Sequence, residues 1–315
     1  MKYAICFPGQ GAQQVGMGRE LFDTFPAAKA VFQEADDALS AHLSELIFNG
    51  PEGELTLTAN AQPAIMTVSV AALRALQDDM GVDLVPAFTA GHSLGEYTAL
   101  VAAGTLSFWD AVRLVNKRGR WMQEAAPEGV GAMAAILGLD AEAVRAVCAE
   151  AAPEGECQAA NFNSPGQVVI SGVAEFVDKA SELAKARGAR KTVRLNVSAP
   201  FHSRLMVPAA EKLKTEFDKC GWADPKWPLV ANVSAKPVTA ADAIRASLYE
   251  QTFSPVLWED SVAYMADNGV DTFLELGPGE VLCGLIKRCR KGLTQKAAGT
   301  PKALEAVAEL LREAR

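Results

Sequence analysis

The chain has 315 residues, of which 50% are hydrophobic and 22% are charged, and it carries a net charge of −8. This is the composition of a globular protein long enough for one large domain or two smaller ones. The negative charge argues against broad binding to nucleic acid or to an anionic membrane. No stretch approaches the roughly 20 apolar residues that a membrane span needs.

The N-terminal segment and the cysteines are typical of a cytoplasmic protein. The start, MKYAICFPGQG, has too short an apolar run before Pro8 to form a secretory signal. The six cysteines are scattered and form no C-x-x-C pair, so we expect reduced thiols and no disulfide frame. None of the three histidines has a partner at the spacing of a metal site, so we expect no metal.

Short apolar runs alternate with longer helical patterns, which is typical of α/β proteins. Residues 3–9, YAICFPG, predict a buried strand that ends at Pro-Gly. Residues 87–104, AFTAGHSLGEYTALVAAG, predict a strand, a glycine turn and a helix. Residues 107–126 predict a long helix that begins after Ser107, whose side chain would cap it.

The segment 129–199 has a different pattern. It reads in order as strand, helix, two strands around an Asn-Ser-Pro-Gly turn, a second helix and a last strand. This β-α-β-β-α-β order is typical of a ferredoxin-like module. We therefore predict a subdomain at 129–199 inserted into a larger domain formed by 1–128 and 200–315.

Two elements follow in the second part of the larger domain. Residues 271–289 repeat the form of strand, glycine turn and helix. Residues 300–315 predict a C-terminal helix with Thr300 as its cap and Pro301 at its first position.

The motif Gly91-His92-Ser93-Leu94-Gly95 has the G-x-S-x-G spacing of a turn that exposes a nucleophilic serine. A serine hydroxyl needs a neighbouring base. His92 adjoins Ser93, but adjacent side chains diverge at a sharp turn, so we expect it to pack inside. His42 lies on a helical pattern with no special surroundings. His202 follows the inserted module in a loop that could enter a cleft, and the residues alone leave open whether it is the base.

The loop at residues 7–13, FPGQGAQ, lies directly after the first strand. It lacks the spacing of a dinucleotide or P-loop motif. It could offer the Gln10 N–H to an oxyanion, with the Leu94 N–H as a second donor. The alternative is a tight turn that requires glycine, and the loop by itself favours that alternative.

Seven motifs occur together in one order along nearly the whole chain, and with them the sequence resembles the malonyl-CoA:acyl carrier protein transacylase family, kin of the acyltransferase domains of polyketide and fatty acid synthases. The motifs are FPGQGAQ, GHSLGEYTAL, KRGRWMQEA, ANFNSPGQVVISG, SAPFHS, LYEQTFSPVLW and ELGPGEVLCGLIKR. The resemblance implies a hydrolase-like α/β core with a mostly parallel sheet and a ferredoxin-like insertion.

The resemblance also implies the catalytic groups. Ser93 is expected to be the nucleophile and His202 its base. The oxyanion would be held by the main-chain N–H groups of Gln10 and Leu94. The main-chain carbonyl of Gln251, in place of a carboxylate, would orient the histidine.

The acyl group would be selected by a second set of residues. Arg118 matches the arginine that pairs with the malonyl carboxylate, although most basic residues on such a helix are solvated. Phe201 matches a position associated with malonyl in preference to methylmalonyl groups. Asn161 and Asn163 match positions that line the cleft.

The implied reaction is ping-pong transfer of a malonyl group from malonyl-CoA to the thiol of acyl carrier protein, as a monomer and without a cofactor, since the coenzyme A thioester is a substrate. Carrier proteins of this type are acidic, so docking needs local positive charge. The candidates are Arg190, Lys191, Arg194, Lys287 and Arg288. The alternative is that these residues are ordinary solvent-exposed charges with no role in docking.

Two other functions remain open at this point. A serine esterase or thioesterase would use the same serine and histidine with water as the acceptor. A non-enzymatic binding or scaffold protein would keep the G-x-S-x-G turn, but its serine would not act as a nucleophile. The sequence also leaves open whether fatty acid or polyketide synthesis is served.

Overall fold

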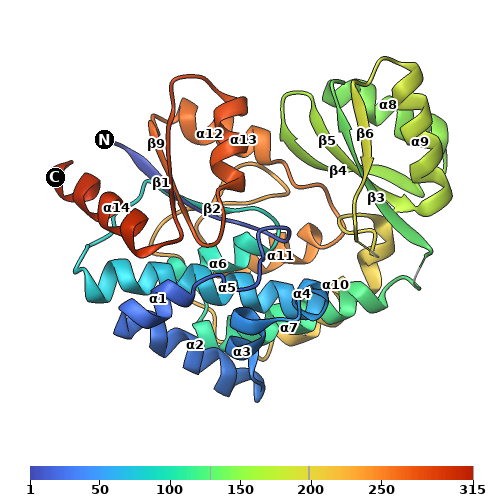
Figure 1. Ribbon diagram of the computed structural model, residues 1–315. Helices are drawn as coiled ribbons and strands as arrows, with labels where there is room; N and C mark the ends of the chain where they lie inside the picture. The colour runs from blue at the N-terminus through green and yellow to red at the C-terminus, as the bar shows by residue number, and fades with distance from the viewer. Residues whose placement is uncertain (128, 198, 315) are drawn as a thin grey trace.

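The structure is a computed structural model that describes residues 1–127, 129–197 and 199–314 (Figure 1). Residues 128, 198 and 315 lie outside the described residues. The predicted boundary at 128, one position of the predicted insertion and the last position of the predicted C-terminal helix fall on them.

The larger sheet has six strands in the order β10-β9-β1-β2-β7-β8. All neighbouring pairs are parallel except β7 and β8. The strands are β1 (Tyr3–Phe7), β2 (Phe88–Gly91), β7 (Leu229–Val230), β8 (Pro237–Val238), β9 (Thr272–Leu276) and β10 (Thr294–Ala298). The mostly parallel sheet predicted for the core is confirmed.

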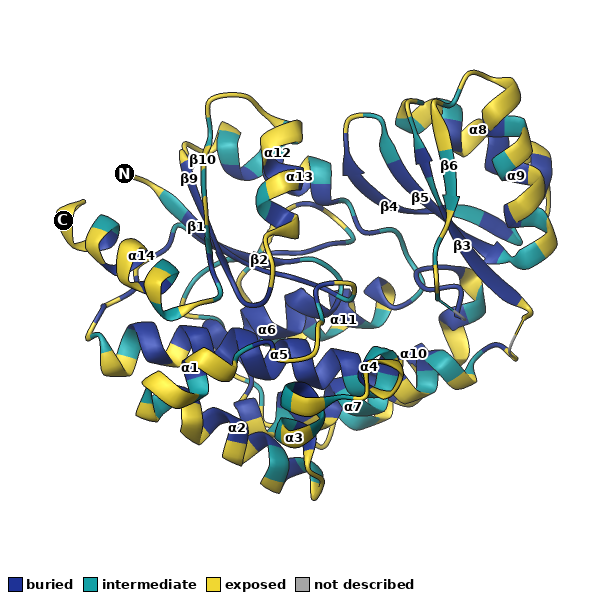
Figure 2. Cartoon of the chain, viewed as in Figure 1, coloured by how far each residue is buried: buried dark blue, intermediate teal, exposed yellow. Residues whose placement is uncertain are grey.

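Helices cover both faces of this sheet. Successive side chains of the buried strand β1 point to opposite faces, so both faces must be covered. Ile5 and Phe7 pack into a core with α5 (Thr58–Arg74), α6 (Leu94–Ala102) and α7 (Phe108–Glu124). Ala4 and Cys6 point to the other face, beneath α12 (Trp258–Asp267) and α13 (Val281–Cys289). Figure 2 shows α5 and α6 almost wholly buried, because α5 is surrounded by other helices and α6 lies between the sheet and the helices α5 and α7.

The remaining helices of the larger unit complete these two layers. They are α1 (Arg19–Thr24), α2 (Pro26–Leu39), α3 (Leu43–Asn49), α4 (Glu52–Thr56), α10 (Val207–Phe217), α11 (Ala241–Gln251), α12 (Trp258–Asp267), α13 (Val281–Cys289) and α14 (Pro301–Glu313), with a π-helical turn at Ala75–Asp79 and a 3-10 turn at Arg204–Met206. Both predicted caps are confirmed: the Ser107 hydroxyl accepts the Asp110 N–H at 3.0 Å, and the Thr300 hydroxyl accepts the Ala303 N–H at 3.3 Å. None of the helices in the described ranges is long and apolar enough to cross a membrane.

The second sheet is antiparallel, with strand order β4-β5-β3-β6. Its elements are β3 (Gly131–Leu137), α8 (Ala141–Ala151), β4 (Cys157–Ser164), β5 (Gln167–Val173), α9 (Ala174–Ala186) and β6 (Lys191–Arg194). The element order and the strand order are those of a ferredoxin-like unit, as the fold class predicted. The exact division at 128/129 and 199/200 stays a prediction.

One local prediction in this unit was wrong. The turn was expected to occupy Asn-Ser-Pro-Gly at 163–166, but β4 continues through Ser164, so Pro165 and Gly166 alone make the turn. A register shift between Phe162 and Ser164 passes over Asn163 and brings Ser164 opposite Gln167 of β5.

The two faces of the second sheet have different neighbours. One face packs against α8 and α9 in a core of its own. From the other face, Met133 and Val169 join Met122 and Phe201 of the larger unit. The second sheet therefore forms a wall beside the carboxyl end of β2, where Ser93 lies.

Candidate active site

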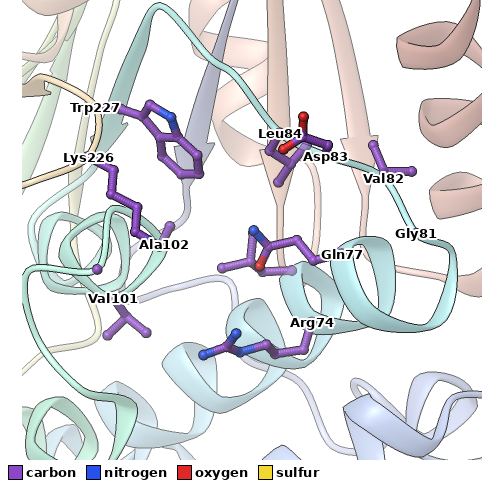
Figure 3. A pocket seen from close by; sticks show the side chains of 12 residues that line it. Arg74, Gln77, Gly81, Val82, Asp83, Leu84, Val101, Ala102, Lys226 and Trp227 are labelled. Atoms are coloured by element: carbon purple, nitrogen blue, oxygen red, sulfur yellow. The ribbon is translucent and has the colours of Figure 1, made fainter.

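Two cavities of similar size differ in the chemistry of their walls. The cavity in Figure 3 has a volume of about 540 Å³, and its described lining, which includes Arg74, Gln77 and Trp227, contains no serine or histidine. The other measures about 460 Å³ and is lined by Ser93, Arg118 and His202. The second sheet forms part of its wall together with the segments that follow β1 and β2, and it is the candidate active site.

The backbone at Ser93 is strained, as a nucleophile turn requires. Ser93 lies between β2 and α6 with φ 52° and ψ −106°. The flanking glycines make this possible, because a Cβ on Gly91 would lie 1.9 Å from the Gly95 carbonyl carbon and one on Gly95 would lie 2.0 Å from the Phe7 oxygen. The sharp turn places the Ser93 hydroxyl in the cavity.

His202 reaches Ser93 from the segment after the second sheet. The distance from Ser93 Oγ to His202 Nε2 is 2.7 Å, and His202 Nδ1 lies 2.8 Å from the Gln251 main-chain oxygen. The carbonyl can only accept, so Nδ1 carries the proton and Nε2 is free to accept from the serine. Burial, aided by the Arg118 charge, lowers the pKa of His202 to about 3, so the ring is neutral. The arrangement is a base-activated serine.

The two predicted oxyanion donors line the same cavity. Leu94 is the first residue of α6, so its N–H has no carbonyl partner within the helix. Gln10 lies in the loop after β1, and its side chain donates to the Thr58 hydroxyl at 3.3 Å. The loop is packed tightly on the turn, because a Cβ on Gly9 would lie 2.4 Å from the His92 oxygen.

Arg118 is the main electrostatic feature of the cavity. It is only 1% exposed, whereas the sequence alone favoured a solvated face. Its Nη1 donates to Gln62 Oε1 at 2.8 Å, and its Nη2 donates to Gln251 Oε1 at 3.0 Å and to Ser93 Oγ at 3.2 Å. Within the part of the chain that the structure describes, no ion pair includes Arg118. A buried cation thus lies beside the nucleophile, and its hydrogen-bond partners among the described residues are neutral.

The other predicted pocket residues also face the cavity. Phe201 is 8% exposed and packs with Met122 and Met133. Asn161 and Asn163, both buried on β4, are part of the lining.

The expectation that His92 packs inside was only partly right. Its ring packs against Trp258, but it is half-buried and forms part of the cavity wall. His92 Nε2 lies 2.8 Å from Asn163 Oδ1, which joins the turn to β4. His42 lies outside the cavity, exposed, at the start of α3.

The five predicted docking residues are all exposed and lie on two elements. Arg190, Lys191 and Arg194 lie at β6, and Lys287 and Arg288 lie in the last turn of α13. Arg194 is paired with Asp178. Arg288 donates to Gln167 Oε1 at 2.6 Å, and Gln167 lines the cavity. Arg288 therefore lies at the cavity rim.

Several residues at the site escaped the sequence analysis. Asn232 Oδ1 accepts the Ser93 N–H at 2.8 Å, and its Nδ2 donates to the Gly91 oxygen at 2.7 Å, so it braces the turn from both sides. Gln62 and Glu96 are likewise buried beside the catalytic groups. No motif marked Asn232 or Gln62, because their partners lie on distant segments.

Comparison with known proteins identifies the family. The acyl transferase domain family matches residues 5–311. This chain belongs to that family. Relatives named malonyl CoA-acyl carrier protein transacylase include one from Bacillus subtilis, 52% identical over 99% of this chain and 98% of the relative, and one from Escherichia coli K12, 48% identical over 98% and 99%.

Solved structures of other family members share the fold. An acyl-carrier-protein-S-malonyltransferase from Bartonella henselae is 46% identical, with a TM-score of 0.97 over 99% of this chain and 100% of that one. A malonyl-transacylase in complex with a type II polyketide synthase acyl-carrier protein is 44% identical, with a TM-score of 0.95 over 98% and 100%. The cavity around Ser93 is therefore the candidate active site of this acyl transferase.

Proposed function

We propose that this acyl transferase moves a malonyl group from malonyl-CoA to the phosphopantetheine thiol of acyl carrier protein through a malonyl-Ser93 ester, supplying extender units for fatty acid or polyketide synthesis. The observation that carries the proposal is the buried guanidinium of Arg118, which lies 3.2 Å from Ser93 Oγ without a carboxylate partner among the described residues. The names of the relatives support the same reaction.

Arg118 would select the acyl group by its charge. A guanidinium carries five N–H groups, and three of those on Arg118 donate to Gln62, Gln251 and Ser93. Acylation turns the Ser93 hydroxyl oxygen, which accepts from Nη2, into an ester oxygen, which is a weaker acceptor, so this Nη2 proton becomes available to a stronger acceptor. A carboxylate can then accept from Nη1 and Nη2 together. An acyl group without a carboxylate leaves the cation unpaired in a buried site.

The first half-reaction forms the ester. Neutral His202 takes the Ser93 proton at Nε2 as Oγ attacks the thioester carbonyl. The N–H groups of Gln10 and Leu94 hold the oxyanion. The Gln251 carbonyl keeps the Nδ1 proton in place while the ring is charged. Coenzyme A then leaves as a thiol with the proton from Nε2.

The second half-reaction reverses these steps with a different thiol. The carrier-protein thiol gives its proton to His202 and attacks the malonyl-Ser93 carbonyl, and Ser93 regains a proton as it leaves. Both thiols lie at the end of the same kind of phosphopantetheine arm, so one cavity can serve both half-reactions. Coenzyme A takes part as a substrate, and the proposed reaction requires no cofactor. The similarity to a transacylase solved with its carrier protein supports this acceptor over water.

Phe201 would limit the size of the acyl group. Its ring lies in the cavity wall beside His202, packed by Met122 and Met133. A phenyl ring held in this way crowds a methyl branch next to the reacting carbonyl. Malonyl is therefore the expected substrate in preference to methylmalonyl.

The carrier protein would dock on the basic rim. Arg190 packs against Gly138, whose N–H donates to the Gly166 oxygen, and Gly166 precedes the Gln167 that Arg288 contacts. Arg190 and Arg288 thus flank one turn beside the cavity. We expect Arg190→Glu and Arg288→Glu to raise the KM for carrier protein and leave that for malonyl-CoA unchanged. Equal changes in both constants would contradict this docking surface.

Intact-mass measurement tests the reaction directly. Mixing with malonyl-CoA should add one malonyl mass to the protein, and Ser93→Ala should abolish the adduct. Addition of holo carrier protein should move the mass to the carrier. Release of free malonate in place of carrier acylation would favour the esterase alternative, and an adduct that survives Ser93→Ala would refute the mechanism.

A further inference from the structure

Gln251 makes hydrogen bonds to Arg118, Ser93 and His202, although only its main-chain carbonyl was expected to act. Its Oε1 accepts from Arg118 at 3.0 Å. Its Nε2 donates to the Ser93 main-chain oxygen at 2.8 Å and to Glu96 Oε2 at 3.0 Å. Its main-chain oxygen holds His202. Gln251 is fully buried, so water cannot replace any of these partners.

Only one orientation of the Gln251 amide satisfies this network. An amide has an acceptor on one side and a donor on the other, and rotation by half a turn exchanges them. After such a flip, Oε1 would face the Ser93 oxygen and the Glu96 carboxylate, acceptor against acceptor. The NH₂ group would meanwhile face the Arg118 guanidinium, donor against donor. The acceptors beside Gln251 Nε2 therefore determine which way the amide points, and through Oε1 they determine the alignment of Arg118.

Glu96 supplies one of the two close acceptors at that side. It lies in the first turn of α6 and is fully buried, and its Oε2 also accepts the Asn232 N–H at 3.1 Å. The third acceptor, Asn232 Oδ1, lies 3.4 Å from Gln251 Nε2 and already receives the Ser93 N–H. Without Glu96, the Ser93 oxygen would be left as the one strong acceptor that fixes the amide.

A buried carboxyl group at this position is costly, which argues for a specific role. Burial raises the pKa of Glu96 to about 7, although the donors from Gln251 and Asn232 favour the charged form. Its Oε1 has no hydrogen-bond partner among the described residues. An apolar side chain would fill the same space without that cost.

We propose that Glu96 is a positioning residue: it fixes the orientation of the Gln251 amide and thereby keeps the Arg118 guanidinium aligned for the carboxylate of the acyl group. This inference rests on the proposed function, because the carboxylate is that of the malonyl group. Glu96 acts as a hydrogen-bond acceptor, so a neutral amide oxygen in its place can do the same work.

The test compares Glu96→Gln with Glu96→Met, which keeps the length of the side chain but offers no such acceptor. The rate of Ser93 acylation is measured with malonyl-CoA and with acetyl-CoA. For Glu96→Met we expect a loss of about 10- to 150-fold with malonyl-CoA, the effect of one misdirected hydrogen bond to a charged group. Acetylation should change less than about 3-fold, and Glu96→Gln should stay within about 3-fold of wild type on both substrates.

Thr98→Val is the matched control. Thr98 is on the same helix and fully buried, and its hydroxyl has no partner within the described ranges. It should leave both rates unchanged. Equal losses of malonylation and acetylation in Glu96→Met, or a loss in Glu96→Gln as large as in Glu96→Met, would overturn the proposal.

A second variant covers the case in which Glu96→Met does not fold. Gln251→Met removes the amide but keeps the main-chain carbonyl, and it should show the same selective loss of malonylation. The double variant should lose no more malonylation activity than either single variant, because both substitutions disrupt the same hydrogen-bond network. A wild-type protein that takes no malonyl group refutes the proposed function, whereas an active wild type with unaltered selectivity in the variants refutes only the role of Glu96.

Discussion

Replacement of Arg118 by methionine should convert a carboxylate-selective enzyme into a weakly selective one. The thioether side chain fills most of the same volume, so the cavity keeps its shape. A malonyl carboxylate loses two charge-assisted hydrogen bonds of about 1.5–3 kcal/mol each, a total of about 3–6 kcal/mol. At 1.36 kcal/mol for each factor of ten, malonyl transfer should fall by about 10²- to 10⁴-fold.

Acetyl transfer should fall much less, because the acetyl group makes neither hydrogen bond. The assay is kcat/KM for malonyl-CoA and acetyl-CoA with the same holo carrier protein. The substitution leaves two buried acceptors, Gln62 Oε1 and Gln251 Oε1, without their donor, so the thermal unfolding of the variant must be followed as well. Arg120→Met is the control, since Arg120 is exposed on the same helix. Equal fold losses for the two substrates would refute the assignment of Arg118 to the carboxylate.

Three further predictions concern the support of the site. The pKa of His202 is about 3 in the folded protein and about 6.5 in an unfolded chain, so its contribution to stability is present above pH 6.5 and is lost toward pH 3. In urea titrations, the free energy of unfolding of wild type relative to His202→Gln should fall by about 2 kcal/mol between pH 7 and pH 5, and a constant difference would argue against a buried neutral ring. Gly95→Ala should destabilise the fold by more than about 3 kcal/mol, because its Cβ would lie 2.0 Å from the Phe7 oxygen; unchanged thermal unfolding would contradict that contact. Ser107→Ala should cost about 1 kcal/mol in urea unfolding through loss of the α7 cap, with little change in acyl selectivity.

Local chemistry made several parts of this protein predictable from its sequence. The strand, turn and helix around Ser93 follow from apolar runs and from glycines where a Cβ cannot fit. The caps at Ser107 and Thr300 follow from side chains that reach N–H groups three residues ahead. The element order of the antiparallel unit also followed from periodicity, while its turn at 165–166 did not, because register shifts in β4 depend on its partner strand.

The burial of Arg118 could have been read from helical spacing. Val115, Arg118 and Met122 lie three and four residues apart, on the buried stripe of α7. Arg113 and Arg120 fall outside that stripe. The stripe alone places the cation toward the core. It does not show that the cation faces a nucleophile, nor that no described residue forms an ion pair with it.

Tertiary structure decided how the catalytic groups are held. Glu96, Asn232 and Gln251 meet through hydrogen bonds between residues 136, 155 and 19 positions apart. Patterns of three to five residues encode a turn or a cap, because the interacting atoms belong to neighbouring residues. The orientation of the Gln251 amide depends instead on acceptors brought together by the packing of α11 on the β2–α6 turn. These residues are far apart in the sequence, so no local spacing predicts their contact.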